Sequence, residues 1–196
     1  MSNPLSRFVA ILLLFPFVGA LARGAETSAP AAAATSAAAA QKLERRNNAA
    51  SLLAQLVDDE KGLHYVLILK GHRAELQQLV KNISATATSI QDQLQALAKA
   101  DPTLNLRAVE LPAGEIATRA AIESTKEHEL LLTSGADFEF TLLLTQADAL
   151  SYGWHLAQIV ADNSPNPAQA KQFANFSTAF HNLYTQTVTL MRSPPK

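Results

Sequence analysis

Apolar residues recur at helical spacing along most of the chain from residue 42 onward. In the stretch 73–99 they follow one another in steps of three and four, which places them on one face of a helix. A continuous apolar face of this kind is typical of a helix that packs along its whole length in a bundle. The positions on this face are Leu76, Leu79, Ile83, Ala87, Ile90, Leu94 and Leu97.

The same spacing predicts four more helices, over residues 43–69, 115–133, 138–161 and 168–191. No segment shows the alternation of a half-buried strand. We therefore expect an all-α fold in which a short helix precedes the third of four long ones. A ferritin-like four-helix bundle with one long crossover has this connectivity. Helix-breaking residues separate the segments, namely Gly71, Asp101-Pro102, Gly135 and the turn 163–167.

The first 22 residues have the three parts of a cleavable secretory signal peptide. Arg7 supplies the positive charge, residues 8–20 form the apolar run, and Ala20 and Ala22 fit the small-x-small cleavage pattern. The alternative is a membrane anchor, which needs about 20 apolar residues. This run is shorter and contains Pro16. We expect cleavage, a periplasmic or secreted protein, and no membrane span in the mature form.

The remaining chain divides by composition into a linker, one domain and a tail. Residues 23–41 are rich in alanine and form a low-complexity linker. Small side chains bury little area, so we expect a disordered leader with transient helix, and a spacer is the functional alternative. Residues 42–192 form one helical domain, and residues 193–196 form the tail.

Charge and cysteine content exclude several classes of function. The chain has no cysteine, which excludes disulfides, thiolate metal sites and cysteine nucleophiles. The net charge is −1, and removal of Arg7 with the signal leaves −2. This balance gives no broad electrostatic attraction to nucleic acid or to an anionic membrane surface.

Two short motifs recur in a known family. Residues 133–139 read TSGADFE, where a short helix ends and a long one begins, and residues 171–174 read KQFA. With the signal peptide and the order of helices, they make residues 48–190 resemble a bacterial family of exported, ferritin-like four-helix-bundle proteins of unknown function. That family typically carries a histidine late in its second, fourth and last long helices. The matching positions lie near Ala87, Leu150 and Tyr184, none of which is histidine, so the resemblance implies no metal role there.

Glu60 and His64 are the best remaining candidates for a metal site. A di-iron site of the ferritin-like kind needs Glu-x-x-His on two helices, and this spacing does not occur in the sequence. Glu60 and His64 lie four residues apart on the apolar face of the first helix. In a functional interpretation they are metal ligands or an acid–base pair, together with His155 or His181 across the bundle. In a structural interpretation they are a hydrogen-bonded pair at the edge of the apolar face. We favour the structural interpretation and expect no cofactor, with a divalent metal as the alternative.

Two other clusters have plain structural interpretations. Glu123, Glu127, His128 and Glu129 fit a solvated helix face better than a weak cation site. Trp154 beside His155 fits a core aromatic with a boundary histidine better than a ligand pocket. Neither a Gly-x-Ser-x-Gly elbow nor a His-Glu-x-x-His motif occurs.

We therefore expect a non-enzymatic helical-bundle protein with a binding or structural role in the cell envelope. Its partner is an envelope protein or a small ligand. The alternative is a metal- or small-ligand-binding bundle with a degenerate ferritin-like site. A hydrolase whose site is assembled from scattered residues is a third hypothesis.

Overall fold

The described part of the chain is almost entirely helical. The computed structural model describes residues 31–70, 72–107 and 111–193, and no strand occurs among them. No helix in these ranges is long and apolar enough to span a membrane. The elements are α1 (Ala31–Glu60), the 3-10 helix η2 (Leu63–Leu69), α2 (Ala74–Ala100), α3 (Ala113–Leu132), α4 (Gly135–Asn163) and α5 (Pro167–Arg192). The all-α prediction is confirmed.

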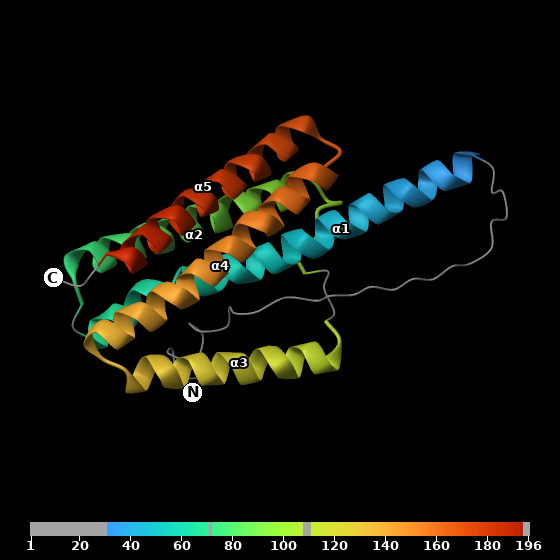
Figure 1. The fold of residues 1–196 in the computed structure, drawn as a ribbon. Coiled ribbons are helices and arrows are strands. Elements are labelled where there is room, and N and C mark those ends of the chain that lie inside the picture. Colours follow the sequence, from blue (N-terminus) through green and yellow to red (C-terminus); the bar gives the residue numbers. More distant parts are fainter. Residues whose placement is uncertain (1–30, 71, 108–110, 194–196) are drawn as a thin grey trace.

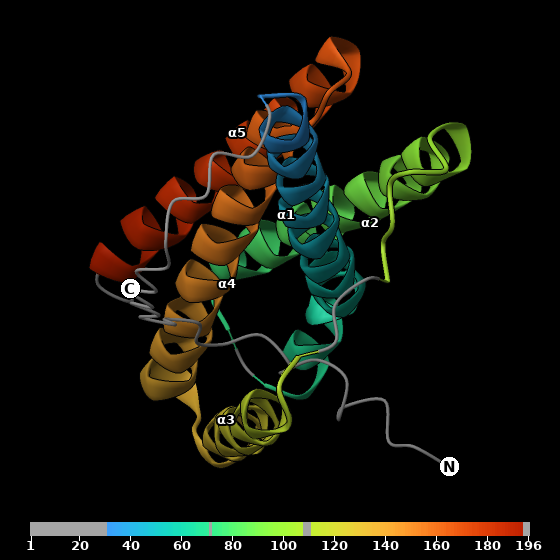
Figure 2. The same ribbon diagram turned by 90° about the vertical axis from the view of Figure 1, so that its right-hand side faces the viewer.

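Four long helices pack around one apolar core, and α3 lies outside them (Figures 1 and 2). α4 packs most extensively against α5 and α1, and α2 contacts α1 and α5. α3 packs mainly against α4. The core takes its largest apolar side chains from all four long helices, among them Leu53, Leu76, Ile83, Leu94, Phe138, Leu142, Leu150, Phe173 and Phe180.

The expected helix boundaries hold for α2, whose apolar series is buried except at Leu97. The expected helix 43–69 is instead interrupted. α1 ends at Glu60, and the chain continues after Gly62 as the 3-10 helix η2. Glycine costs about 1 kcal/mol relative to alanine inside a helix. The backbone N–H of Gly62 accordingly bonds the carbonyl of Asp59, three residues back, at 3.3 Å.

The alanine-rich stretch also differs from the expectation. We expected a disordered leader up to residue 41, but α1 begins at Ala31. Residues 35–45 are exposed, so this part of the helix is not held by packing. Alanine has the highest helix propensity, and propagation from the buried part of α1 avoids the cost of a separate nucleus. The expected signal peptide, with Ala20 and Ala22, lies outside the described residues.

Gly153 allows α4 to lie close to its neighbours. A Cβ atom built at Gly153 would meet Leu56 Cδ2 at 2.7 Å and Phe180 Cδ1 at 3.0 Å. These two side chains belong to α1 and α5, on either side of α4. The glycine therefore fixes how closely the three helices pack.

Arg46 joins three elements at one end of the core. Its side chain on α1 is completely buried, whereas the residues just before it are exposed. Nη1 donates to Asp101 Oδ2 at 3.2 Å and to Gln169 Oε1 at 3.3 Å. Nη2 donates to Thr103 Oγ1 at 3.0 Å. Hydrogen bonding from Thr103 lowers the pKa of Asp101, so the carboxylate stays charged opposite the guanidinium.

Arg73 and Glu139 make the equivalent connection at the other end. The guanidinium of Arg73, just before α2, lies 2.9 Å from the carboxylate of Glu139 in the first turns of α4. Glu139 also accepts a hydrogen bond from the backbone N–H of Arg73 at 2.8 Å. Arg73 Nη2 donates to the carbonyl of Leu190 at 3.0 Å, near the end of α5. The contacts of the buried Arg46 and of the half-buried Arg73 thus connect the helices at both ends of the bundle.

We expect Arg46→Met to lower the free energy of unfolding by about 3 kcal/mol, because it leaves the buried polar partners of the guanidinium without a donor. Urea denaturation followed by circular dichroism measures this. Arg45→Met is the matched control, because Arg45 is exposed on the same helix. Its effect should stay within about 0.5 kcal/mol. Equal stabilities of the two variants would contradict the role of Arg46.

Candidate functional site

The interruption after α1 separates the two residues expected to form a metal site. Glu60 is the last residue of α1 and is buried, whereas His64 lies in η2 and is half-buried. No hydrogen bond or ion pair joins their side chains within the described residues. They meet indirectly, because Ser84 Oγ donates to the carbonyl of Glu60 and accepts from the backbone N–H of His64. The expected i,i+4 side-chain pair is therefore not formed.

Glu60 is buried at the end of α1. Its Oε1 accepts a hydrogen bond of 3.5 Å from Gln146 Nε2. Its Oε2 is buried without a hydrogen-bond partner, as is Oε1 of Gln146. Burial raises the pKa of Glu60 to about 8, so the carboxyl is protonated at neutral pH. A protonated carboxyl is a poor metal ligand, since metal binding requires loss of the proton.

The two histidines considered as partners of Glu60 lie elsewhere. His155 and His181 are exposed on α4 and α5. Both contact the indole of Trp154, with ring centroids 4.5 and 4.2 Å apart. Among the described residues, no group of three or more histidine, aspartate or glutamate side chains is arranged to hold a metal ion. The structure thus brings none of these histidines to Glu60.

Acidic groups gather where α1 faces α3. Burial raises the pKa of Asp59 to about 7, and the neighbouring Asp58 and Glu123 raise it further. Burial also raises the pKa of Glu123, with a further contribution from Glu127. We expected Glu123 on a solvated face, but it is half-buried opposite α1. Sequence periodicity alone does not show this, because α3 buries only Leu130.

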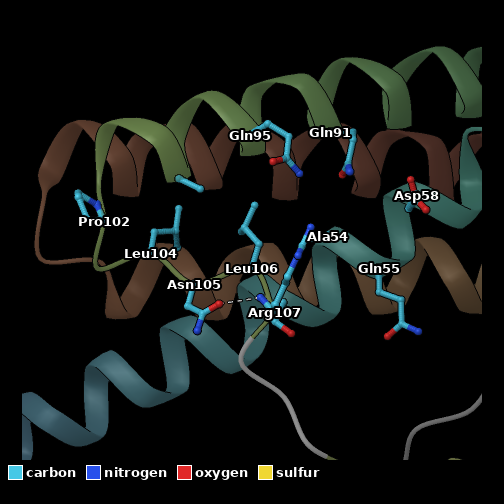
Figure 3. Close-up of a pocket in the computed structure, with 12 residues that line it drawn as sticks. Ala54, Gln55, Asp58, Gln91, Gln95, Pro102, Leu104, Asn105, Leu106 and Arg107 are labelled. Carbon is cyan, nitrogen blue, oxygen red and sulfur yellow. Dashed lines mark hydrogen bonds between the residues drawn. The ribbon is translucent and has the colours of Figure 1, made fainter.

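An open groove lies between α1, α2 and the connection that follows α2 (Figure 3). Its volume is about 790 Å³, within the range of small-molecule sites. Apolar, amide, hydroxyl and charged side chains all contribute to its walls. The lining residues are Ser51, Ala54, Gln55 and Asp58 of α1, Gln91, Gln95 and Ala98 of α2, and Pro102, Leu104, Asn105, Leu106 and Arg107 of the connection.

Arg107 is the principal charged group of the groove. Figure 3 shows its side chain rising from the connection into the space between α1 and α2, on the side of Gln91 and Gln95. No ion pair of Arg107 occurs within the part of the chain that the structure describes. The other charged lining residue, Asp58, is neutralised by Lys61 Nζ at 2.7 Å. Arg107 therefore gives the groove a positive character.

The connection that carries Arg107 is held to α1 by asparagine side chains. Asn47 Nδ2 donates to the carbonyl of Thr103 at 3.0 Å, and Asn47 Oδ1 accepts from the backbone N–H of Asn105 at 3.3 Å. Asn105 Oδ1 in turn accepts from the backbone N–H of Arg107 at 2.8 Å. The loop wall of the groove thus has a defined shape. On the opposite wall, Oε1 of Gln91 is buried without a hydrogen-bond partner.

Sequence analysis missed this groove. In the sequence, the glutamines of α1 and α2 look like ordinary exposed helix positions. The only signal is that Gln91 and Gln95 are one turn apart, which places these two side chains on one face of α2. The connection 101–107 has no periodicity from which its course follows. In comparisons with known proteins, no protein-family model, curated protein or solved structure matches the chain.

Glu60 predicts a dependence of stability on pH. Its pKa of about 8 in the folded protein lies above the ordinary value of 4.5, so the folded state binds the extra proton between these values. The contribution of Glu60 to stability is therefore fully present at and below about pH 4.5 and is lost as the pH rises to about 8. We expect Glu60→Gln to remove this contribution and to gain on the order of 3 kcal/mol over the parent protein at pH 8.

Urea denaturation at pH 5 and pH 8 measures this difference. Glu75→Gln is the matched control, because Glu75 is exposed on α2. It should leave the pH dependence of the parent protein unchanged. Parallel pH profiles for the parent protein and Glu60→Gln would show that the carboxyl of Glu60 does not titrate as described.

Proposed function

We propose that the protein is a non-enzymatic binding protein whose ligand occupies the groove between α1 and α2. The observation that carries this proposal is the side chain of Arg107, which enters a groove of small-molecule size without a described acidic partner. The groove is lined by amide and hydroxyl groups of Ser51, Gln91 and Gln95, which can both donate and accept hydrogen bonds.

The chemistry of the groove favours a small ligand that carries a carboxylate and an N–H donor. A guanidinium binds a carboxylate by two parallel hydrogen bonds, and nearby amide N–H groups support the same anion. The buried Oε1 of Gln91 requires a donor, which a ligand N–H can supply. Apolar contacts with Leu104 and Leu106 accommodate a short aliphatic portion.

This site is preferred over a metal site at Glu60 and His64. Glu60 is protonated at neutral pH, and its carboxyl does not reach His64. A divalent metal would need a further ligand that these elements do not supply within the described residues. We therefore assign the binding role to the groove and not to the interior of the bundle.

N-acetylalanine and N-acetylalaninamide test the proposal, because they differ only in the carboxylate. In ¹H–¹⁵N NMR spectra, N-acetylalanine should shift the side-chain amide signals of Gln91 and Gln95, and N-acetylalaninamide should not. Arg107→Gln should weaken binding about 10-fold, because a charge-assisted hydrogen bond contributes about 1.5–3 kcal/mol. Arg45→Gln is the control outside the groove. Equal shifts with both compounds, or equal loss in both variants, would refute the assignment.

We also propose that the protein is exported and that the mature form belongs to the ferritin-like class of four-helix bundles. The charge, apolar run and alanine pair of residues 1–22 support export. The packing of α1, α2, α4 and α5 around one core, with α3 in the connection between the second and third, supports the ferritin-like assignment. Mass spectrometry of the protein from its native host should give a mature N-terminus beyond residue 22. A mature chain that still contains Arg7 would exclude cleavage.

A further inference from the structure

The groove between α1 and α2 holds one charge without a partner, and this charge is positive. The acidic lining residue is Asp58, and Lys61 Nζ lies 2.7 Å from its carboxylate. The guanidinium of Arg107 makes no ion pair with any residue that the structure describes. A free amino acid carries an ammonium group besides its carboxylate, and the groove offers that group no unpaired acid. The balance of charge therefore favours a ligand whose nitrogen is uncharged, as in an amide.

The hydrogen-bonding groups of the groove also fit an amide. Oε1 of Gln91 is buried and has no hydrogen-bond partner. A buried acceptor without a donor costs free energy, and a neutral N–H supplies the missing bond without bringing a second charge into the groove. A peptide group carries such an N–H together with a carbonyl acceptor. The orphaned acceptor of Gln91 thus matches the main chain of a peptide.

Gln91 and Gln95 have the spacing of an extended chain. They lie four residues apart on α2, which corresponds to a rise of about 6 Å. Two residues of a β-strand span about 6.6 Å, and backbone groups of alternate residues point to the same side of a strand. Figure 3 shows both glutamines on the face of α2 directed toward the connection. An extended peptide beside α2 therefore presents alternate peptide groups at the two glutamines.

The groove has room for more than one residue. Its volume of about 790 Å³ lies toward the upper end of the range of small-molecule sites, which is about 300–1,000 Å³. The groove is also open, so a bound chain can continue beyond the lining residues. On the loop wall Leu104 is buried and Leu106 is half-buried, and both offer apolar contact to small side chains. Size and shape thus suit a short chain better than a single residue.

On the basis of the carboxylate site assigned above, we propose that the ligand is a peptide bound in extended form by its C-terminal end. Arg107 binds the terminal carboxylate, Gln91 Oε1 accepts the N–H of the last residue, and the amide of Gln95 bonds the peptide group two residues before it. Asn47 and Asn105 hold the loop wall in place, so the site is formed before the peptide binds. Recognition through the main chain requires the free carboxylate and tolerates different side chains.

Acetylated peptides of two lengths test this proposal. N-acetylalanine and N-acetyl-trialanine are titrated into the protein, and ¹H–¹⁵N NMR shifts give the two dissociation constants. The longer peptide reaches Gln95, so its dissociation constant should be lower by about 5-fold or more, the effect of one ordinary hydrogen bond. N-acetyl-trialaninamide lacks the carboxylate and should bind about 10-fold more weakly than N-acetyl-trialanine. Free L-alanine should bind about 10-fold more weakly than N-acetylalanine, because its ammonium group has no unpaired acid in the groove.

A pair of variants identifies the second contact of the peptide. Gln95→Ala should bring the two dissociation constants of the acetylated acids close together, because it removes the amide that the longer peptide reaches. Gln77→Ala is the matched control, since Gln77 is exposed on the same helix and does not line the groove. It should keep the preference of the parent protein for the longer peptide. Far-UV circular dichroism confirms that both variants are folded.

The outcomes separate the peptide assignment from the ligand site on which it rests. Equal dissociation constants for N-acetylalanine and N-acetyl-trialanine in the parent protein would overturn the peptide assignment and leave the small-ligand site in place. Binding of neither compound would refute both. A length preference that persists in Gln95→Ala would overturn the extended path along α2. Equal binding of N-acetyl-trialanine and its amide, or of L-alanine and N-acetylalanine, would overturn recognition of an acylated C-terminal end.

Discussion

The buried guanidinium of Arg46 is the constraint on which the rest of the structure depends. A charged group removed from water costs several kcal/mol unless its donors are satisfied. Here satisfaction requires Asp101, Thr103 and Gln169 to lie at fixed places around α1. The end of α2, the connection after it and the start of α5 therefore have one position relative to α1. That same connection forms the loop wall of the groove, so the shape of the proposed ligand site follows from a charge buried in the core.

Periodicity predicts the packing of a helix best where its apolar face is continuous, as in α2. α2 follows its sequence pattern almost residue for residue, because each step of three or four positions returns to the core. Arg46 continues such a series with Ala50, Leu53 and Val57, all of which are buried. Its burial could have been read from its spacing. Its partners could not, because Asp101 and Gln169 lie 55 and 123 residues away in the sequence.

Local backbone preferences explain where the sequence interpretation failed. Glu60 belongs to the apolar face as expected, but Gly62 ends the helix before His64, so the regular spacing no longer relates the two side chains. The groove was missed for a related reason. Its polar walls come from separate elements, and the path of the connection 101–107 is set by side-chain hydrogen bonds from Asn47 and Asn105 rather than by any repeat. Such contacts are visible only once the chain is folded.

The exposed beginning of α1 has a geometric consequence for whatever precedes it. From Ala31 to residue 45 the helix runs beyond the packed core, as Figure 1 shows, and 15 helical residues span about 20 Å. A rod of this kind transmits direction as well as distance. Each residue inserted into or removed from the alanine stretch would change the reach by about 1.5 Å and turn the preceding chain by about 100° around the helix axis. The run of alanines therefore sets an orientation, which a flexible tether of the same length could not do.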